Sequence, residues 1–216
     1  MVGIPPTVRE TLGINDPATL PGREVVTVQY AYVVPEGFVG AEVLAPTTTL
    51  GTLPQMMGNS PDAQARPATA VVERYVLPGD DNVGCQITLA AKDASNIRPT
   101  FTQLLDLSGW GSAAEIRSLF VPLGAELTQV KEVALERGVV DTGTLRGRVA
   151  LAPRSLYRYD FVAPDGLRVC LGVSVRAGKV YVLTATGTEA QWADGALRAK
   201  LQGAADSLRV LDKPIL

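Results

Sequence analysis

The segment Lys179–Thr186 (KVYVLTAT) constrains the fold more than any other part of this chain. Successive residues of a β-strand point to opposite faces of a sheet. Here both sets are apolar: Val180 and Val182 share one face, and Tyr181, Leu183 and Ala185 share the other. Such a strand is stable only in the middle of a covered sheet. We therefore predict that Lys179–Thr186 is a central strand.

Two further strands precede this one, and tight turns join the three. Leu156–Ala163 and Leu167–Arg176 are rich in the β-branched and aromatic residues that favour strands. Pro164–Gly166 is a turn tripeptide between them, and Ala177-Gly178 turns the chain into the central strand. Such short hairpin connections predict antiparallel neighbours.

An amphipathic helix is predicted directly after the central strand. Thr188 and Gln191 have the spacing of a capping box. Gly195 costs about 1 kcal/mol inside a helix, which favours a continuous helix that begins only after it. Apolar residues at steps of three and four form one stripe: Ala193, Leu197, Leu201, Ala204 and Leu208. We expect this stripe to lie on the preceding sheet.

The rest of the chain predicts mainly strands joined by turns. Residues 1–27 are interrupted by proline and glycine and are predicted to form an extended N-terminal arm, either a poorly ordered tail or a segment that orders on a partner. Residues 28–213 are predicted to form a single domain. Ser112 and Glu115 form a second capping box, which predicts a short helix from Ala113 to Val121. The further predicted strands are Val26–Val34, Phe38–Leu44, Thr69–Leu77, Asn82–Ala90, Thr128–Glu136 and Thr144–Ala152.

The composition argues against several classes of function. The 216 residues carry a net charge of −2, so the chain is no general polycation for nucleic acid. The sequence contains no histidine, which excludes Ser-His-Asp and Cys-His sites and every His-ligated metal centre. No stretch approaches the roughly 18–20 apolar residues that span a bilayer. The first thirty residues lack the apolar region of a signal peptide, so either the protein is not exported or its targeting sequence is absent from this chain.

The two cysteines, Cys85 and Cys170, are too few for a thiolate zinc site and leave two interpretations. In its strand Cys85 shares a face with Ile87 and Leu89, whereas Cys170 lies opposite the Val169 face of its own strand. If both apolar faces point into one core, the two sulfur atoms lie on opposite sides of the sheet. We therefore favour two buried small hydrophobic residues over a single disulfide.

Acidic residues offer little support for catalysis or metal binding. Glu115, Asp160 and Asp165 are available acids, but nothing pairs them on one face, and the chain has no phosphate-binding glycine loop. An enzyme is therefore disfavoured. The run Asp80-Asp81-Asn82 lacks the further oxygen ligands at regular spacing that a calcium loop needs, so a hairpin turn is favoured there.

Several short motifs occur in an order that resembles one known family. They are Glu36-Gly37-Phe38, Asp81–Val83, Gly111-Ser112, Tyr157–Asp160, and Lys179–Tyr181 followed by Trp192 and Gly195. Together they cover roughly residues 30–211 and resemble the PsbP family, the extrinsic lumenal proteins of photosystem II with their PsbP-like and PsbP-domain relatives. No single motif is diagnostic, and the resemblance depends on their collinearity.

The resemblance implies an α+β fold, a mainly antiparallel β-sheet packed between helices in a PsbP-like α/β/α sandwich. It also implies a non-enzymatic extrinsic subunit or assembly factor of a thylakoid photosynthetic complex, most of all photosystem II on its oxygen-evolving side. Such a protein lies in the chloroplast thylakoid lumen and is peripheral to the membrane. Calcium is implied by the resemblance alone, and no other cofactor is expected.

The chain departs from the family in ways that favour a divergent PsbP-like protein over the standard subunit. The lysine-rich docking character is missing, since Arg9 and Arg23 are offset by Glu10, Asp16 and Glu24. The histidine proposed to bind metals in some members has no counterpart. Two alternatives stay open. One is a small-ligand-binding sheet module with an apolar cavity beneath the closing helix, and the other is an assembly factor of photosystem I or another thylakoid complex.

Five residues are candidate contacts with a partner, since a few aromatic and arginine anchors usually carry most binding energy. Arg9 and Arg23 lie in the predicted arm, where solvated charges are the alternative. Met56 and Met57 lie in a predicted surface loop, Thr47–Pro67, where a tip folded back on the core is the alternative. Trp110 is the fifth, with core packing as its alternative.

Overall fold

The computed structural model describes residues 21–43, 70–79, 82, 84–98, 104–137, 139–141 and 148–211. Three of the candidate contact residues, Arg9, Met56 and Met57, lie outside these ranges. Residues 1–20 of the predicted arm and the loop Thr47–Pro67 also lie outside them. No helix within the described ranges is long and apolar enough to cross a membrane.

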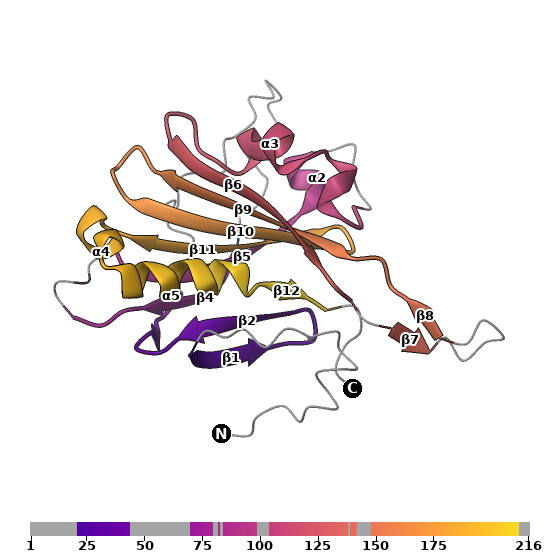
Figure 1. Cartoon of the computed structure of the whole chain (residues 1–216), viewed down its shortest axis with the longest axis horizontal. Coiled ribbons are helices and arrows are strands. Elements are labelled where there is room, and N and C mark those ends of the chain that lie inside the picture. The colour runs from indigo at the N-terminus through magenta and orange to yellow at the C-terminus, as the bar shows by residue number, and fades with distance from the viewer. Residues whose placement is uncertain are drawn as a thin grey trace.

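A seven-stranded antiparallel sheet forms the centre of the molecule (Figure 1). Its middle strand is the predicted one, and every residue of that strand after Lys179 is buried. Each pair of neighbouring strands is antiparallel, which confirms the prediction from the short turns. The order across the sheet is β3 (Val39–Gly40), β4 (Ala70–Val76), β5 (Gln86–Asp93), β11 (Lys179–Gly187), β10 (Arg168–Arg176), β9 (Arg154–Val162) and β6 (Glu126–Leu135).

Short elements cover both faces of this large sheet (Figure 1). One face carries α2 (Ala94–Ile97), η3 (Leu107–Gly109), α3 (Ala113–Ile116) and η4 (Arg117–Leu119). The other face carries α5 (Gly195–Asp206) and a small sheet of β1 (Gly22–Val26), β2 (Tyr30–Pro35) and β12 (Arg209–Val210). The predicted α+β class is confirmed, although a small sheet shares one covering layer with the helix. Two elements complete the described chain, α4 (Glu189–Ala193) and a hairpin of β7 (Val139–Asp141) and β8 (Arg148–Ala150).

Three predicted strands in the first half of the chain are wrong in their bounds. Of the predicted strand Phe38–Leu44, only β3 forms, and the described residues after it are not in a strand. The predicted strand Val26–Val34 is in fact a hairpin, because the Thr27 hydroxyl accepts hydrogen bonds from the backbone N–H groups of Gln29 and Tyr30 and turns the chain. Residues 22–26, which the sequence places in the arm, form β1 of this hairpin. The predicted strand Asn82–Ala90 begins only at Gln86, because backbone hydrogen bonds form a turn from Gly79 to Cys85.

The second half of the chain differs from prediction at two places. The closing helix begins at Gly195, where Asp194 caps it, and ends at Asp206. Leu208, predicted to belong to the helix stripe, follows the helix and is fully buried beside β12. The predicted strand Thr144–Ala152 contains only β8, which pairs with β7, while the strand predicted at Thr128–Glu136 is β6 and pairs with β9.

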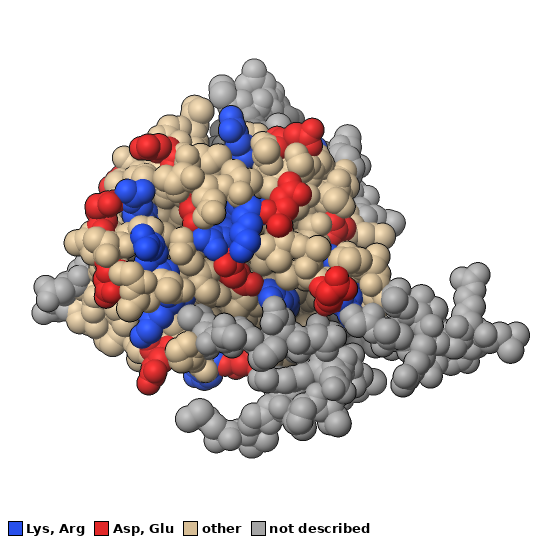
Figure 2. Space-filling view, viewed as in Figure 1, with Lys and Arg blue, Asp and Glu red and all other residues tan. Residues whose placement is uncertain are grey.

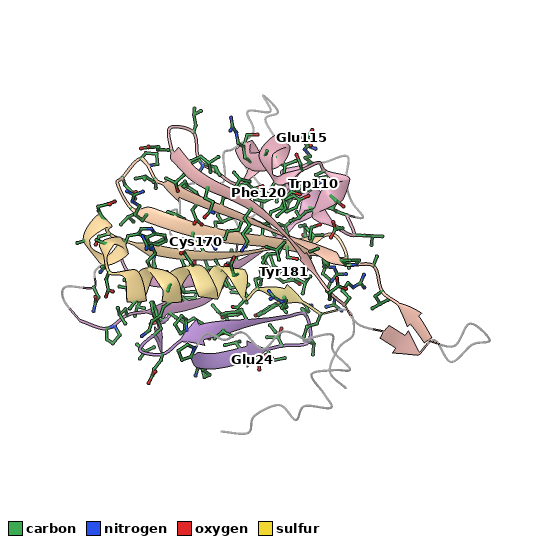
Figure 3. All side chains as sticks on the ribbon, in the orientation of Figure 1. Glu24, Trp110, Glu115, Phe120, Cys170 and Tyr181 are labelled. Carbon is green, nitrogen blue, oxygen red and sulfur yellow. The ribbon has the colours of Figure 1, made fainter. Side chains whose placement is uncertain are left out.

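The side chains of the large sheet fill two separate cores, one on each face. Cys85 and Cys170 both belong to the core beneath α5, where they are buried and unbonded (Figure 3). The favoured interpretation of two buried thiols is confirmed. The argument that placed the sulfur atoms on opposite sides is wrong because it assumed one core, whereas Val169 and its neighbours point into the second core.

Helix α5 approaches the sheet most closely where β10 has a glycine. A Cβ atom built on Gly172 would lie 2.4 Å from the carbonyl oxygen of Ala205, a distance that real Cβ atoms do not show. Leu201, Ala204 and Ala205 of α5 are fully buried at this contact. Close backbone packing of this kind counts against the alternative of an apolar ligand cavity beneath the helix.

A carboxylate joins the small sheet to the large one. The β-bulge between Val71 and Glu73 places the Glu73 side chain on the face that the small sheet covers. Glu73 accepts hydrogen bonds from the hydroxyls of Tyr30 (2.6 Å) and Tyr32 (2.6 Å) on β2, and from Tyr75 (2.8 Å) on its own strand. Burial raises the pKa of Glu73, but these hydrogen bonds outweigh burial, and the pKa lies below its usual value of 4.5.

Replacing Gly172 by alanine should destabilise the protein, because the added methyl group meets backbone rather than a flexible side chain. We expect Gly172→Ala to lower the free energy of unfolding in urea by about 2 kcal/mol or more. The matched control is Gly195→Ala, since a Cβ there meets nothing within 4 Å. Equal stability of the Gly172→Ala variant and the wild type would contradict the close contact.

The stability of the fold should also depend on the charge of Glu73. Because the pKa of Glu73 is lower in the folded state, its carboxylate stabilises the protein above the unfolded pKa, and this contribution is lost as the pH falls through the folded pKa. We expect the stability difference between wild type and Glu73→Gln in urea to shrink below pH 4.5. A difference that is constant with pH would show that the carboxylate charge has no such role.

Candidate functional site

A shallow groove of about 510 Å³ lies between the two C-terminal helices and the β6 side of the large sheet. We call it the α4–α5 groove. Five elements line it: β6 with Thr128 and Gln129, β9 with Asp160, β10 with Arg168, α4 with Glu189, Trp192 and Ala193, and α5 with Arg198 and Gln202. The groove exists because the chain breaks between α4 and α5 at Asp194, which caps the second helix.

A buried ionic network forms the floor of the groove. Arg158 and Asp160 lie two positions apart on β9, and both side chains are 7 % exposed. The Arg158 guanidinium donates to both carboxylate oxygens of Asp160, from Nε at 2.9 Å and from Nη2 at 2.6 Å. Its Nη1 donates to Asp206 of α5 at 2.7 Å, and Gln202 donates to Asp160 at 2.9 Å. The network therefore fixes α5 to β9 and uses the acceptor capacity of Asp160.

The rim of the groove carries arginine side chains and an aromatic ring. Arg168 forms a two-point ion pair with Glu189, which joins β10 to the first turn of α4. The hydrogen bonds from Arg168 hold the pKa of the Glu189 carboxyl below its usual value. Trp192 is half-buried against the core beneath α5. Arg198 is exposed, and within the described ranges no hydrogen bond or ion pair engages its guanidinium.

These charges make the groove suited to an anionic group. Asp160 shares the charge of Arg158 with Asp206, and Glu189 is paired with Arg168. Arg198 is then the charged lining residue with free donors, and Trp192 offers an apolar surface beside it. A carboxylate bound to an arginine gains charge-assisted hydrogen bonds. Figure 2 shows Lys and Arg side chains, with Asp and Glu side chains among them, over the face that carries α5.

Of the candidate contact residues that the structure describes, Arg23 is exposed and Trp110 is buried. Arg23 is exposed on β1, and its guanidinium carbon lies 5.6 Å from the ring centroid of Tyr75. Trp110 is 6 % exposed and packs beside Phe120 in the second core, with ring centroids 6.5 Å apart (Figure 3). The prediction of Trp110 as a contact residue is therefore corrected: its ring fills the core, which was the stated alternative.

The available acids all have structural roles. Glu115 accepts hydrogen bonds from the backbone and side chain of Ser112 in the predicted capping box. Asp165 accepts from the backbone N–H of Leu167 in a turn, and Asp160 belongs to the groove floor. These three residues are not brought together into one site.

The described residues do not fit a calcium site. Asn82 uses its amide to donate to the carbonyl of Pro78, as expected of a hairpin turn. No group of three or more Cys, Asp or Glu side chains suited to a metal occurs among the residues that the structure describes. Asp80 and Asp81 lie outside those residues.

Sequence patterns did not predict the α4–α5 groove. Its residues come from positions 128 to 202 and meet only through the strand order β10-β9-β6. Trp192 and Asp160 were the lining residues with a signal, since each belongs to one of the family-like motifs. Nothing in the spacing of Arg168 and Glu189, which lie 21 residues apart, predicts their ion pair.

Together these features define an α+β protein with a large antiparallel sheet, helices on both faces and a polar groove beside the closing helix. The solved structure of cyanobacterial PsbP (CyanoP) from Synechocystis sp. PCC 6803 has a similar fold, with a TM-score of 0.52 and 15 % sequence identity over 91 % of this chain and 95 % of that chain. At this identity the likeness shows the fold alone. No protein-family model and no curated protein matches the sequence.

Breaking the floor of the groove should be costly. We expect Arg158→Met to lower the free energy of unfolding by about 3–5 kcal/mol, because it leaves buried carboxylate charge without its partner. The double variant Arg158→Met/Asp160→Leu should recover part of this loss, since the Asp160 carboxylate is no longer left without its partner. Arg168→Met, which breaks an ion pair on the surface, is the control and should have little effect in the same urea titration. Equal losses for the two arginine variants would contradict a buried network.

Proposed function

We propose that this protein is a non-enzymatic extrinsic factor of a thylakoid photosynthetic complex, with photosystem II favoured, acting as a subunit or as an assembly factor. The observation that carries the proposal is the fold likeness to cyanobacterial PsbP over 91 % of the chain. The collinear motifs at residues 36–38, 111–112, 157–160 and 179–195 give independent support from the sequence. The protein then lies in the thylakoid lumen, peripheral to the membrane. Its location in a chloroplast stays a prediction.

The α4–α5 groove is the contact face that we propose for this function. Its free arginine and half-buried tryptophan are residue types that often dominate protein interfaces. The expected occupant is an acidic segment of a partner subunit, because a carboxylate complements Arg198. Arg23 is retained as a second candidate contact because it is exposed on β1, the edge strand of the small sheet.

The alternative functions differ in the partner complex or ligand that the protein would bind. An assembly factor of photosystem I or of another thylakoid complex would use the same surface with a different subunit. A role in retaining calcium is proposed only from the family resemblance, and it would have to operate through the partner complex because the described residues offer no calcium site. A small-ligand module has less support, since α5 packs directly on β10.

Co-migration with photosynthetic complexes tests the proposal. A tagged full-length chain, directed to the lumen of a thylakoid-containing host, should migrate with photosystem II in a native gel of mildly solubilised thylakoids. Migration with photosystem I would select the alternative complex. Migration with neither complex, or recovery from the cytosol, would contradict the proposed function.

Two charge-reversal variants test the contact face in the same gel. Arg198→Glu should reduce the co-migrating fraction several-fold, because it places a negative charge where the acidic segment binds. Arg117→Glu makes the same change in net charge on η4, whose neighbours Ile116 and Leu119 pack in the opposite core. Arg117→Glu should therefore bind like the wild type. Equal binding of both variants would exclude the groove without excluding the function.

A further inference from the structure

A chain of four tyrosines crosses the seam between the small sheet and the large one. The ring centroids are 6.3 Å apart for Tyr75 and Tyr32, 6.1 Å for Tyr32 and Tyr30, and 5.5 Å for Tyr30 and Tyr181. All four rings are buried, with exposed fractions from 1 % to 8 %. Neighbouring rings at these separations are in or near van der Waals contact.

Three of these phenols share one base. The hydroxyls of Tyr30, Tyr32 and Tyr75 donate to the Glu73 carboxylate at 2.6–2.8 Å, and they are the only hydrogen-bond donors that the structure describes on that carboxylate. A single carboxylate that accepts hydrogen bonds from three phenols is more than docking of β2 requires. The fourth phenol, Tyr181, donates to the side-chain oxygen of Gln29 at 2.8 Å.

The other core provides an internal contrast. Tyr157 and Tyr159 are equally buried, but their hydroxyls donate to backbone carbonyls, those of Gly111 at 2.8 Å and Ala113 at 2.9 Å. A carboxylate is basic enough to take the proton of a phenol that has lost an electron, whereas a backbone carbonyl is not. The three tyrosines on Glu73 and the two in the other core therefore differ in the availability of a base and not in burial.

We propose that Tyr30, Tyr32 and Tyr75, with Glu73 as proton acceptor, form a site that reduces one-electron oxidants of the peroxyl-radical class. In this step one electron passes from a phenol to the peroxyl radical, which becomes a hydroperoxide anion. The phenolic proton moves along its hydrogen bond to Glu73, and a neutral tyrosyl radical and a protonated carboxyl remain. The hydroperoxide anion takes its proton from water. A reductant of the ascorbate or thiol class then returns an electron to the ring, and Glu73 returns the proton.

The geometry assists both halves of this cycle. Proton transfer needs heavy atoms within about 2.6–3.2 Å, and all three phenols meet that condition. Electron transfer does not require the oxidant to touch the ring, so a buried phenol can react. The neighbouring rings of Tyr30, Tyr32 and Tyr75, which are tilted or edge-on to one another, let the radical move among the phenols that share Glu73, and burial keeps it from coupling with a tyrosine of another molecule. Arg23, which is exposed over Tyr75, marks the surface end of the chain.

This activity goes beyond the proposed function, because docking on a photosynthetic complex needs neither the tyrosine chain nor Glu73. The test is flash oxidation of the full-length protein by photogenerated tris(bipyridine)ruthenium(III), with radical formation followed by optical absorption and electron paramagnetic resonance. The wild type should form a tyrosyl radical with a clear slowing in D₂O, because the proton moves in the same step as the electron. Spin trapping and peptide mapping should place the radical at position 30, 32 or 75.

Variants distinguish the contribution of the Glu73 base from that of the tyrosine rings. Glu73→Gln keeps a hydrogen-bond acceptor but removes the base, and it should slow radical formation about tenfold or more. Tyr159→Phe removes a buried tyrosine that has no base and should leave the rate unchanged. Should Glu73→Gln fail to fold, Tyr30→Phe and Tyr32→Phe each retain Glu73 and should each lower the radical yield. Radicals mapped to Tyr157 or Tyr159, an unchanged rate in Glu73→Gln, or no isotope effect in the wild type would overturn the proposal.

Discussion

The structure depends on a constraint in two adjacent strands, β10 and β11, whose side chains are buried on both faces. Neither face can be left open to water, so the chain must supply two covering layers. Short helical turns cover one face, and one longer helix with a three-stranded sheet covers the other. The rest of the fold follows from the need to hold these layers in place.

Polar groups hold the layers together at their seams. Glu73 connects the small sheet to β4, Arg158 connects α5 to β9, and Asp106 connects the η3 turn to β9 by accepting from the backbone and hydroxyl of Ser155. In each case a charged group that would be costly to bury alone has several partners. The candidate groove and the tyrosine chain both lie at such seams, because these are the places where burial and polar chemistry coincide.

Local patterns predict this fold well where one short stretch decides the outcome. The capping boxes at Ser112 and Thr188, the hairpins around Pro164–Gly166 and Ala177-Gly178, and the central position of Lys179–Thr186 are of this kind. Prediction fails where residues far apart in the sequence determine the structure. The bulge that orients Glu73 and the second core, which reverses the argument about Cys170, are two examples. The groove is a third, because its lining comes from five elements. None of these has a periodicity that one sequence reveals.

The small sheet joins the two ends of the described chain, since β12 pairs with β2 at Arg209 and Val210, and the backbone N–H of Leu211 donates to the carbonyl of Gln29. During synthesis the hairpin of residues 22–35 therefore waits for the last strand before its layer is complete. Domains in general fold as units, and this one completes its small sheet only after residues 209–211 have left the ribosome. A nascent chain of this protein consequently stays open along one edge of its small sheet until residues 209–211 have emerged from the ribosome.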